Sequence, residues 1–196
     1  PVNGNAFAAQ SCNTRPPTGI SGSRSVALIL DVQRVTNAAS VPEQAEFLSW
    51  VRATLSGSRD SPGQDVELTI RLVDAAESAA LNAKYRGRGG ATNVLSFPFE
   101  APPGLDARTR AALPTLLGDL VICAPVVLFE AEDQQKPPAA HWAHMVVHGL
   151  LHLLGHDHTE PAEATGMEKL ETAILRELGF PPPYEVPQGT HDERPI

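Results

Sequence analysis

Three histidines in the C-terminal half of the chain have the residue type and spacing of metal ligands: His148, His152 and His158. On a helix, His148 and His152 would stand one turn apart on a single face, where both imidazoles can bind one ion. Gly155 is suited to end that helix, since glycine readily adopts the left-handed conformation. The chain can then turn back and bring His158 to the same ion. Three imidazoles leave the fourth tetrahedral position to water, which is the arrangement of a catalytic zinc site.

The residues around these histidines help to distinguish a metal site from a chance cluster of histidines and from a metallopeptidase motif. A chance cluster of core or surface histidines is the alternative, but offsets of four and six residues around a helix-ending glycine favour a metal site. The pattern resembles the HExxH motif of metallopeptidases, yet Gly149 stands where that motif has its general base. His144 shares the face of His148, but a rise of about 1.5 Å per residue puts it about 12 Å from His152. We therefore expect His144 in the core or behind the ligands, and His141 at the surface.

A basic cluster near the middle of the chain is the second candidate for chemistry. Lys84, Arg86 and Arg88 stand together, with no acidic residue between Glu77 and Glu100. The net charge of −8 argues against a simple RNA-binding protein, but a local basic patch can hold a few phosphates. Arg86 is the strongest candidate, because a guanidinium matches phosphate with paired donors. From charge alone, an exposed arginine at a helix end is an equally good interpretation.

The elements that would position these residues alternate between strands and helices. Val66, Leu68, Ile70 and Leu72 alternate with polar residues, which predicts a half-buried strand. Proline, glycine and capping signals, including a capping box at Ser40 and a cap at Thr159, set the other boundaries. We predict one α+β domain with a mixed, roughly four-stranded sheet, about five helices and a central histidine-bearing helix. The expected strands are 26–32, 66–72, 94–99 and 119–124, and the expected helices begin near residues 40, 74, 125, 139 and 159.

Length and composition indicate one globular domain. The chain has 196 residues and is 42% hydrophobic, enough for one core and too short for two comfortable ones. No apolar run reaches the roughly 18 residues of a membrane span, and no secretory signal is visible. Residues 1–25 are polar and predicted to be disordered, 26–184 form the domain, and 185–196 form a loose tail. Cys12 and Cys123 form no disulfide framework, which favours a reducing cytoplasm.

Three stretches together resemble a known family. They are HGLLHLLGHDH at 148–158, NAKYRG at 82–87 followed by TNVLSFP at 92–98, and LGDLVI at 117–122. In type and order they are similar to the YbeY family, the single-strand-specific, metal-dependent endoribonucleases of bacterial and organellar rRNA maturation. The resemblance runs from about residue 26 to about residue 184. His156 departs from it, because members often carry tyrosine at that position.

The resemblance implies a zinc-dependent endoribonuclease in rRNA maturation and ribosome quality control, with one Zn²⁺ per chain. It implies that Arg86 is required, and we expect that residue to stabilise charge on the reacting phosphate, with Lys84 and Arg88 as weaker RNA contacts. The sequence does not identify the general base: the metal's water, Asp157 and His156 are the candidates. Asp157 could also be a fourth metal contact or a turn residue, and we favour it as an acceptor that orients an imidazole. Attack by water and attack by the RNA 2′-hydroxyl both remain open.

Other functional expectations follow from the same resemblance. Single-stranded rRNA, a small-subunit ribosomal protein and an assembly GTPase are the implied partners, with no membrane, and the sequence leaves the oligomeric state open.

A metalloprotease-like hydrolase and a non-catalytic assembly factor with a structural zinc are the alternative functions. Thr92, Asn93 and Ser96 could line the cleft or cap turns, and Tyr85 is expected to lie in the core or to pack its helix against a neighbour.

Overall fold

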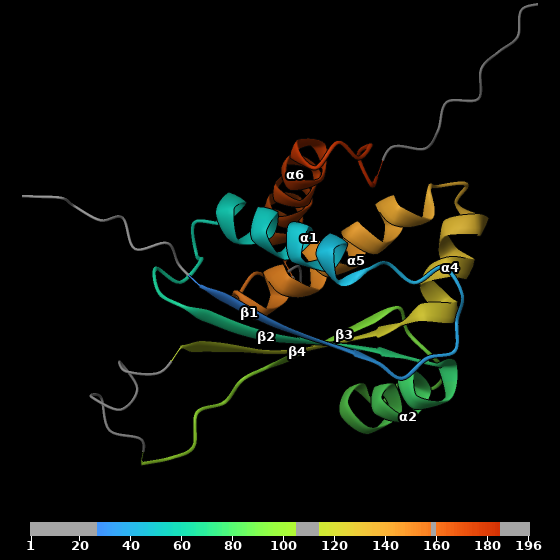
Figure 1. The fold of residues 1–196 in the computed structure, drawn as a ribbon, viewed down its shortest axis with the longest axis horizontal. Helices are drawn as coiled ribbons and strands as arrows, with labels where there is room; N and C mark the ends of the chain where they lie inside the picture. Colours follow the sequence, from blue (N-terminus) through green and yellow to red (C-terminus); the bar gives the residue numbers. More distant parts are fainter. Residues whose placement is uncertain (1–26, 105–113, 158–159, 185–196) are drawn as a thin grey trace, which may run out of the picture.

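The computed structural model describes residues 27–104, 114–157 and 160–184. In these ranges the chain forms one mixed sheet and five helices, which confirms the predicted α+β domain (Figure 1). The strands are β1 (Leu28–Arg34), β2 (Val66–Val73), β3 (Val94–Pro98) and β4 (Thr115–Cys123). The helices are α1 (Gln44–Gly57), α2 (Ala75–Arg86), α4 (Ala124–Asp133), α5 (Pro138–Leu153) and α6 (Pro161–Glu177).

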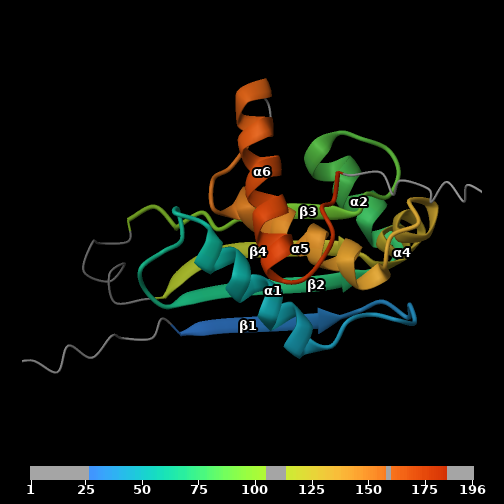
Figure 2. The same cartoon turned by 90° about the horizontal axis from the view of Figure 1, so that it is seen from above.

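The sheet has the order β1-β2-β4-β3, with β3 as the antiparallel edge strand beside three parallel strands. Its alternating pattern sends one set of side chains into the core, as the fully buried Ile70 and Leu72 show. Helices α1, α5 and α6 lie on that side, and α2 lies on the opposite side (Figures 1 and 2). Pro98 ends β3 at the sheet edge, where a missing backbone N–H is tolerated.

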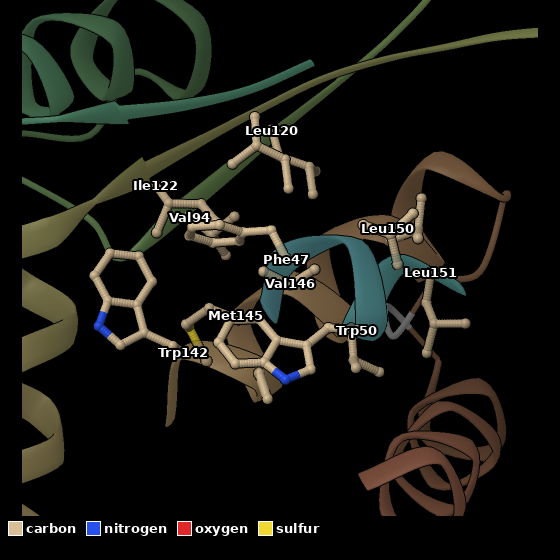
Figure 3. Close-up of a cluster of buried hydrophobic side chains, with 14 of the residues drawn as sticks. Phe47, Trp50, Val94, Leu120, Ile122, Trp142, Met145, Val146, Leu150 and Leu151 are labelled. Carbon is tan, nitrogen blue, oxygen red and sulfur yellow. The ribbon is translucent and has the colours of Figure 1, made fainter. Parts of the chain in front are cut away.

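Helix α5 is the centre of the core. Trp142, Val146 and Leu150 are fully or almost fully buried, and Figure 3 shows them in one apolar cluster with Leu120 of β4. Gly149 lets the helix approach the sheet closely, because an added Cβ would lie 2.9 Å from a methyl group of Leu120. A larger residue at 149 would therefore have to displace the side chains of Leu120 in β4 and Val94 in β3.

Two helix stops follow the sequence prediction and two helix starts differ from it. Gly87 and Gly155 end α2 and α5 with φ angles of +65° and +94°, as expected for left-handed caps. Ser40 was wrongly assigned to the capping box of α1. The box pairs Glu43, the N-cap, with the Glu46 side chain three residues later. Likewise, Glu160 is the N-cap of α6, whereas the predicted cap Thr159 lies outside the described residues.

None of the helices in the described ranges is both long enough and apolar enough to cross a membrane. The predictions for residues 1–25 and 185–196, and for Cys12, concern segments outside those ranges. Cys123 is buried at the end of β4, as its apolar surroundings in the sequence predict.

Candidate active site

Helix α5 carries four histidines, each three or four residues from the next. Successive ring centroids from His141 through His144 and His148 to His152 are 6.1, 6.2 and 4.7 Å apart. Side-chain exposure rises along the row, from 3% at His141 to 12% at His144 and 26% at His148. The row therefore starts in the core and opens toward solvent at its C-terminal end.

That open end lies in a pocket of about 470 Å³. It joins the end of α2, strand β3, helix α5 and the segment after α5, and its lining residues are Arg86, Arg88, Asn93, Val94, Ser96, His148, His152 and Asp157. The two groups of residues singled out in the sequence, histidines and arginines, thus share one cavity. His158, the predicted third ligand, lies outside the described residues.

The turn after α2 positions the two arginines. Gly87 adopts the left-handed conformation, and the Arg88 backbone N–H then donates to the Asn82 carbonyl at 3.4 Å. The Asn82 side chain donates to the Gly90 carbonyl at 3.0 Å, which fastens the far side of the turn. Arg86 also sits in the last turn of its helix, where the dipole favours a cation. The local sequence therefore places two cations at the rim of the pocket.

The third basic residue of the cluster is placed differently. Lys84 is not among the residues lining the pocket, and its ammonium nitrogen lies 4.8 Å from the ring centroid of Tyr85. Tyr85 is 57% exposed, so of its two predicted placements, the core or helix packing, the core is wrong. Its ring instead meets Phe97 edge-on, with centroids 5.0 Å apart.

The polar residues of β3 use their hydrogen bonds to fix the pocket wall. Ser96 Oγ donates to the Gly149 carbonyl at 3.0 Å and so ties β3 to α5. Asn93 Nδ2 donates to Glu130 at 3.1 Å, while its Oδ1 accepts from the Val94 N–H at 2.7 Å. Both residues line the pocket, as one of the two sequence interpretations expected, but Thr92 is not among the lining residues.

A buried carboxylate behind the pocket was missed by sequence reasoning. Glu171 of α6 is fully buried, and its Oε1 lies 2.7 Å from His148 Nδ1. Its Oε2 accepts from the Tyr184 hydroxyl and lies 3.5 Å from His144 Nε2. A signal existed in the sequence: Glu171 interrupts the apolar stripe of α6, four residues after Met167 and three before Ile174.

The hydrogen bonds set the charge of this cluster. Burial alone would raise the pKa of Glu171, but hydrogen bonds from His144, His148 and Tyr184 outweigh it and bring the pKa down to about 2. Burial also lowers the pKa of His144 despite its contact with Glu171. The Glu171 carboxylate is therefore ionised near neutral pH, where it can only accept hydrogen bonds.

Two overlapping sets of residues could hold a metal ion. One is the predicted set of His148 and His152, with His158 outside the described residues; the other is His144, His148 and Glu171, whose ligand atoms lie within 4.8 Å of one another. In a tetrahedral zinc site with bonds of about 2.0–2.1 Å, neighbouring ligand atoms stand about 3.3 Å apart. The 2.7 Å between His148 Nδ1 and Glu171 Oε1 is shorter and has the length of a hydrogen bond. The second set thus fits better as a support for His148.

Two further histidine interpretations need correction. His141 is buried rather than at the surface, and its Nε2 lies 2.8 Å from the carboxylate of the partly exposed Glu130. His156, expected at the wall of the site, is not among the pocket-lining residues. Its Nε2 lies 3.3 Å from both Ser58 Oγ and Asp60 Oδ2 beyond the end of α1.

Comparison with known proteins shows that most of the chain matches one family model. Residues 31–179 match the model described as endoribonuclease YbeY, a range that includes every pocket-lining residue and Glu171. The solution structure of TM1509 from Thermotoga maritima is also similar, with 21% sequence identity and a TM-score of 0.47. That match covers 77% of this chain and 88% of the Thermotoga chain.

Proposed function

The chain belongs to the endoribonuclease YbeY family, and from this premise we propose that it cleaves single-stranded RNA at a zinc centre formed by His148, His152 and His158. Membership indicates an endoribonuclease of rRNA maturation. Zinc dependence, single-strand specificity and a part in ribosome quality control are the added proposals. The observation that supports a zinc-dependent nuclease site is the pocket that holds Arg86 together with His148 and His152, while single-strand specificity and ribosome quality control rest on the family resemblance.

The histidine pair fits a zinc ion chemically. The two rings stand one helical turn apart, with centroids separated by 4.7 Å and planes at 82°. Because His148 Nδ1 donates to Glu171, its Nε2 carries the lone pair that a metal requires. Zinc bound there would polarise a phosphoryl oxygen and lower the pKa of a water molecule. One ion per chain satisfies this ligand set.

The arginines would bind and stabilise the phosphate. Arg86 can direct paired donors at the phosphoryl oxygens, whose negative charge grows as the phosphodiester bond breaks. Arg88 lines the same pocket and is suited to a neighbouring phosphate. Lys84 would contact the RNA backbone outside the pocket. Asp157 is the carboxylate among the lining residues, and we assign it either proton transfer or the orientation of a ligand imidazole.

The test is cleavage of a labelled single-stranded RNA by the purified chain, with a duplex of the same sequence as comparison. We expect Arg86→Ala to lose cleavage but keep zinc, and His152→Ala to lose both. Arg52→Ala serves as the matched control, since it removes an exposed cation of α1 that does not line the pocket. Equal cleavage by all variants would contradict the assignment. A folded, zinc-bound protein without activity would favour the non-catalytic assembly factor.

The metal set is tested by the same variants. His152 belongs to the predicted ligand set but not to the group of His144, His148 and Glu171. We expect His152→Ala to abolish tight zinc binding and His144→Ala to preserve most of it. The reverse result would move the metal to the second group.

The packing of α5 argues against a peptidase. A side chain at Gly149 would start 2.9 Å from Leu120 and 3.1 Å from Val94, so a glutamate could enter this position only by displacing those packed side chains. Casein cleavage that depends on His152 would contradict this conclusion.

The remaining partners rest on the family. RNA is the partner that membership supports directly. We propose in addition a small-subunit ribosomal protein, an assembly GTPase and a cytoplasmic location. Co-purification of the tagged chain with immature small subunits, lost at high salt, is the expected result.

A further inference from the structure

We propose that Glu171 and Tyr184 are positioning residues for the metal ligand His148: Tyr184 holds the Glu171 carboxylate, and the carboxylate fixes the imidazole so that Nε2 is the metal-binding atom. This inference rests on the proposed zinc centre and names the support on which it depends. Neither residue lies among those that line the pocket, so both would act through His148.

The first argument is the burial of Glu171. Its side chain has no exposed surface, although a carboxylate is among the most costly groups to remove from water. Apolar residues of similar volume often stabilise a fold equally well or better than a buried ionic group. Met167 and Ile174 occupy the same stripe of α6 and show that an apolar residue suits this face. A role other than stability is therefore the better explanation for a glutamate at 171.

The second argument is that both carboxylate oxygens have assigned partners. Oε1 accepts from His148 Nδ1 at 2.7 Å, and Oε2 accepts from the Tyr184 hydroxyl. Since a carboxylate cannot rotate without losing one of these bonds, the two contacts together fix its plane. The His148 ring is held in turn, because its Nδ1–H must point at Oε1.

The consequence for His148 is a defined tautomer. A neutral imidazole carries one N–H, so a hydrogen on Nδ1 leaves the lone pair on Nε2. Histidine ligands commonly donate their second ring nitrogen to a carboxylate, which orients the ring and increases its basicity. Glu171 comes from α6, so the packing of α6 against α5 sets the geometry of the ligand.

The third argument is how Tyr184 is held. It follows α6, and the Lys136 ammonium donates to the carbonyl of the preceding residue, Pro183. Earlier in the same segment, Phe180 packs against Trp50 with ring centroids 6.3 Å apart. The Tyr184 ring also meets His144 edge-on at 5.5 Å. The segment after α6 is thus anchored at several points, and its last described residue reaches the support of the metal ligand.

The test reads the ring nitrogens of His148 directly. Nitrogen-15 spectra of the zinc-free, full-length chain report which ring nitrogen is protonated, without zinc or RNA. We expect the Nδ1–H form in the unmodified protein and a mixture of tautomers in Glu171→Leu, which has no acceptor at this position. Glu177→Leu is the matched control, since it removes an exposed glutamate from the same helix.

Zinc affinity, measured by competition with a chelator, is the second readout. We expect Glu171→Leu to weaken it by about 10- to 100-fold and Tyr184→Phe by about threefold to tenfold, the effect of one lost hydrogen bond. Unchanged affinity and tautomer in a folded Glu171→Leu would overturn the proposal. A loss as complete as that of His148→Ala would overturn it too, because Glu171 would then be a ligand.

These outcomes are separable from failure of the proposed function. If Glu171→Leu does not fold, Tyr184→Phe decides the question with the same two readouts, since it removes one hydroxyl from a half-exposed ring. If the unmodified protein cuts no RNA, the proposed nuclease fails, while the tautomer of His148 still shows whether Glu171 orients the ring.

Discussion

Helix α5 contains two histidine–carboxylate pairs that differ in what lies beyond the ring. His141 meets Glu130 of α4 at 2.8 Å, and His148 meets Glu171 of α6 at 2.7 Å. The first ring is 3% exposed, and within the described residues its buried Nδ1 has no hydrogen-bond partner. The second ring is 26% exposed and lines the pocket. Both rings therefore have a carboxylate partner, but only His148 also reaches the pocket, as a metal ligand would have to.

The carboxylates of the two pairs also differ in their other hydrogen-bond partners. Glu130 also accepts from Asn93, so the His141 pair braces a wall of the pocket from behind. Burial would raise the pKa of Glu130, but the hydrogen bonds from His141 and Asn93 outweigh it and lower that pKa. Glu171 is held by Tyr184 and faces the proposed ligand. One pair supports the pocket wall, and the other supports the proposed zinc ligand.

Removing the two histidines in turn should produce the largest contrast. We expect His148→Ala to reduce RNA cleavage on the order of 1000-fold and to abolish tight zinc binding, because a ligand is lost. We expect His141→Ala to retain zinc affinity but to lower the free energy of unfolding by about 1–3 kcal/mol, since Glu130 loses a partner. Cleavage assays, zinc titration and urea denaturation measure the three quantities. Equal loss of zinc in both variants would remove the distinction between the pairs.

Replacing Arg86 separates the phosphate half of the pocket from the histidine half. We expect Arg86→Ala to reduce cleavage by about 100- to 1000-fold, the usual effect of losing a group that stabilises transition-state charge. Arg86→Lys should recover only part of that loss, because a lysine keeps the charge but not the paired donors. Zinc affinity should not change in either variant. A parallel loss of zinc would mean that Arg86 supports the ligands instead.

Acid should weaken both pairs. A carboxylate with a depressed pKa stabilises the fold above its unfolded pKa of about 4.3, and that stability is lost as the pH falls through the folded pKa. For Glu171 the loss lies between about pH 4.5 and pH 2. We expect Glu130→Gln to be less stable than the unmodified chain by about 1–2 kcal/mol at pH 7, with a smaller difference at pH 3. Urea denaturation at both pH values checks this, and a difference that grows in acid would contradict it.

The smallest effect is expected outside the pocket. Lys84→Ala should change cleavage by less than about threefold, because an exposed lysine beside RNA contributes a weak, screened attraction. The effect should disappear at high salt. A loss as large as that of Arg86→Ala would extend the active site beyond the residues that line the pocket.

Sequence patterns predicted most of the fold because they are local. The alternation of β2, the glycine stops at Gly87 and Gly155, and the apolar face of α5 each depend on neighbours within a few residues. The start of α1 was misassigned, because Ser40 and Glu43 have the capping spacing, but the helix begins one turn later, at Gln44. The spacing of residues in the sequence does not show which of two overlapping capping boxes forms.

The candidate site was predictable where its residues carry a motif and was missed where they do not. The pocket joins Arg86, His148 and His152, as the motifs suggested. Glu171 and Tyr184 approach His148 through the packing of α6, a contact between residues far apart in sequence that no spacing indicates. The burial of His141 was missed for the same reason, since its partner Glu130 comes from another helix.

The close packing at Gly149 has a consequence for redesign. The residue after the first ligand histidine faces β3 and β4, where any side chain would meet Leu120 or Val94. A new acid–base residue therefore cannot be introduced next to the proposed ligand on α5 without repacking Leu120 and Val94. The opposite wall, at Arg88, is where an engineer could exchange a side chain without disturbing this packing. A new reactive side chain would therefore be easier to introduce on the pocket wall opposite α5 than on α5 itself.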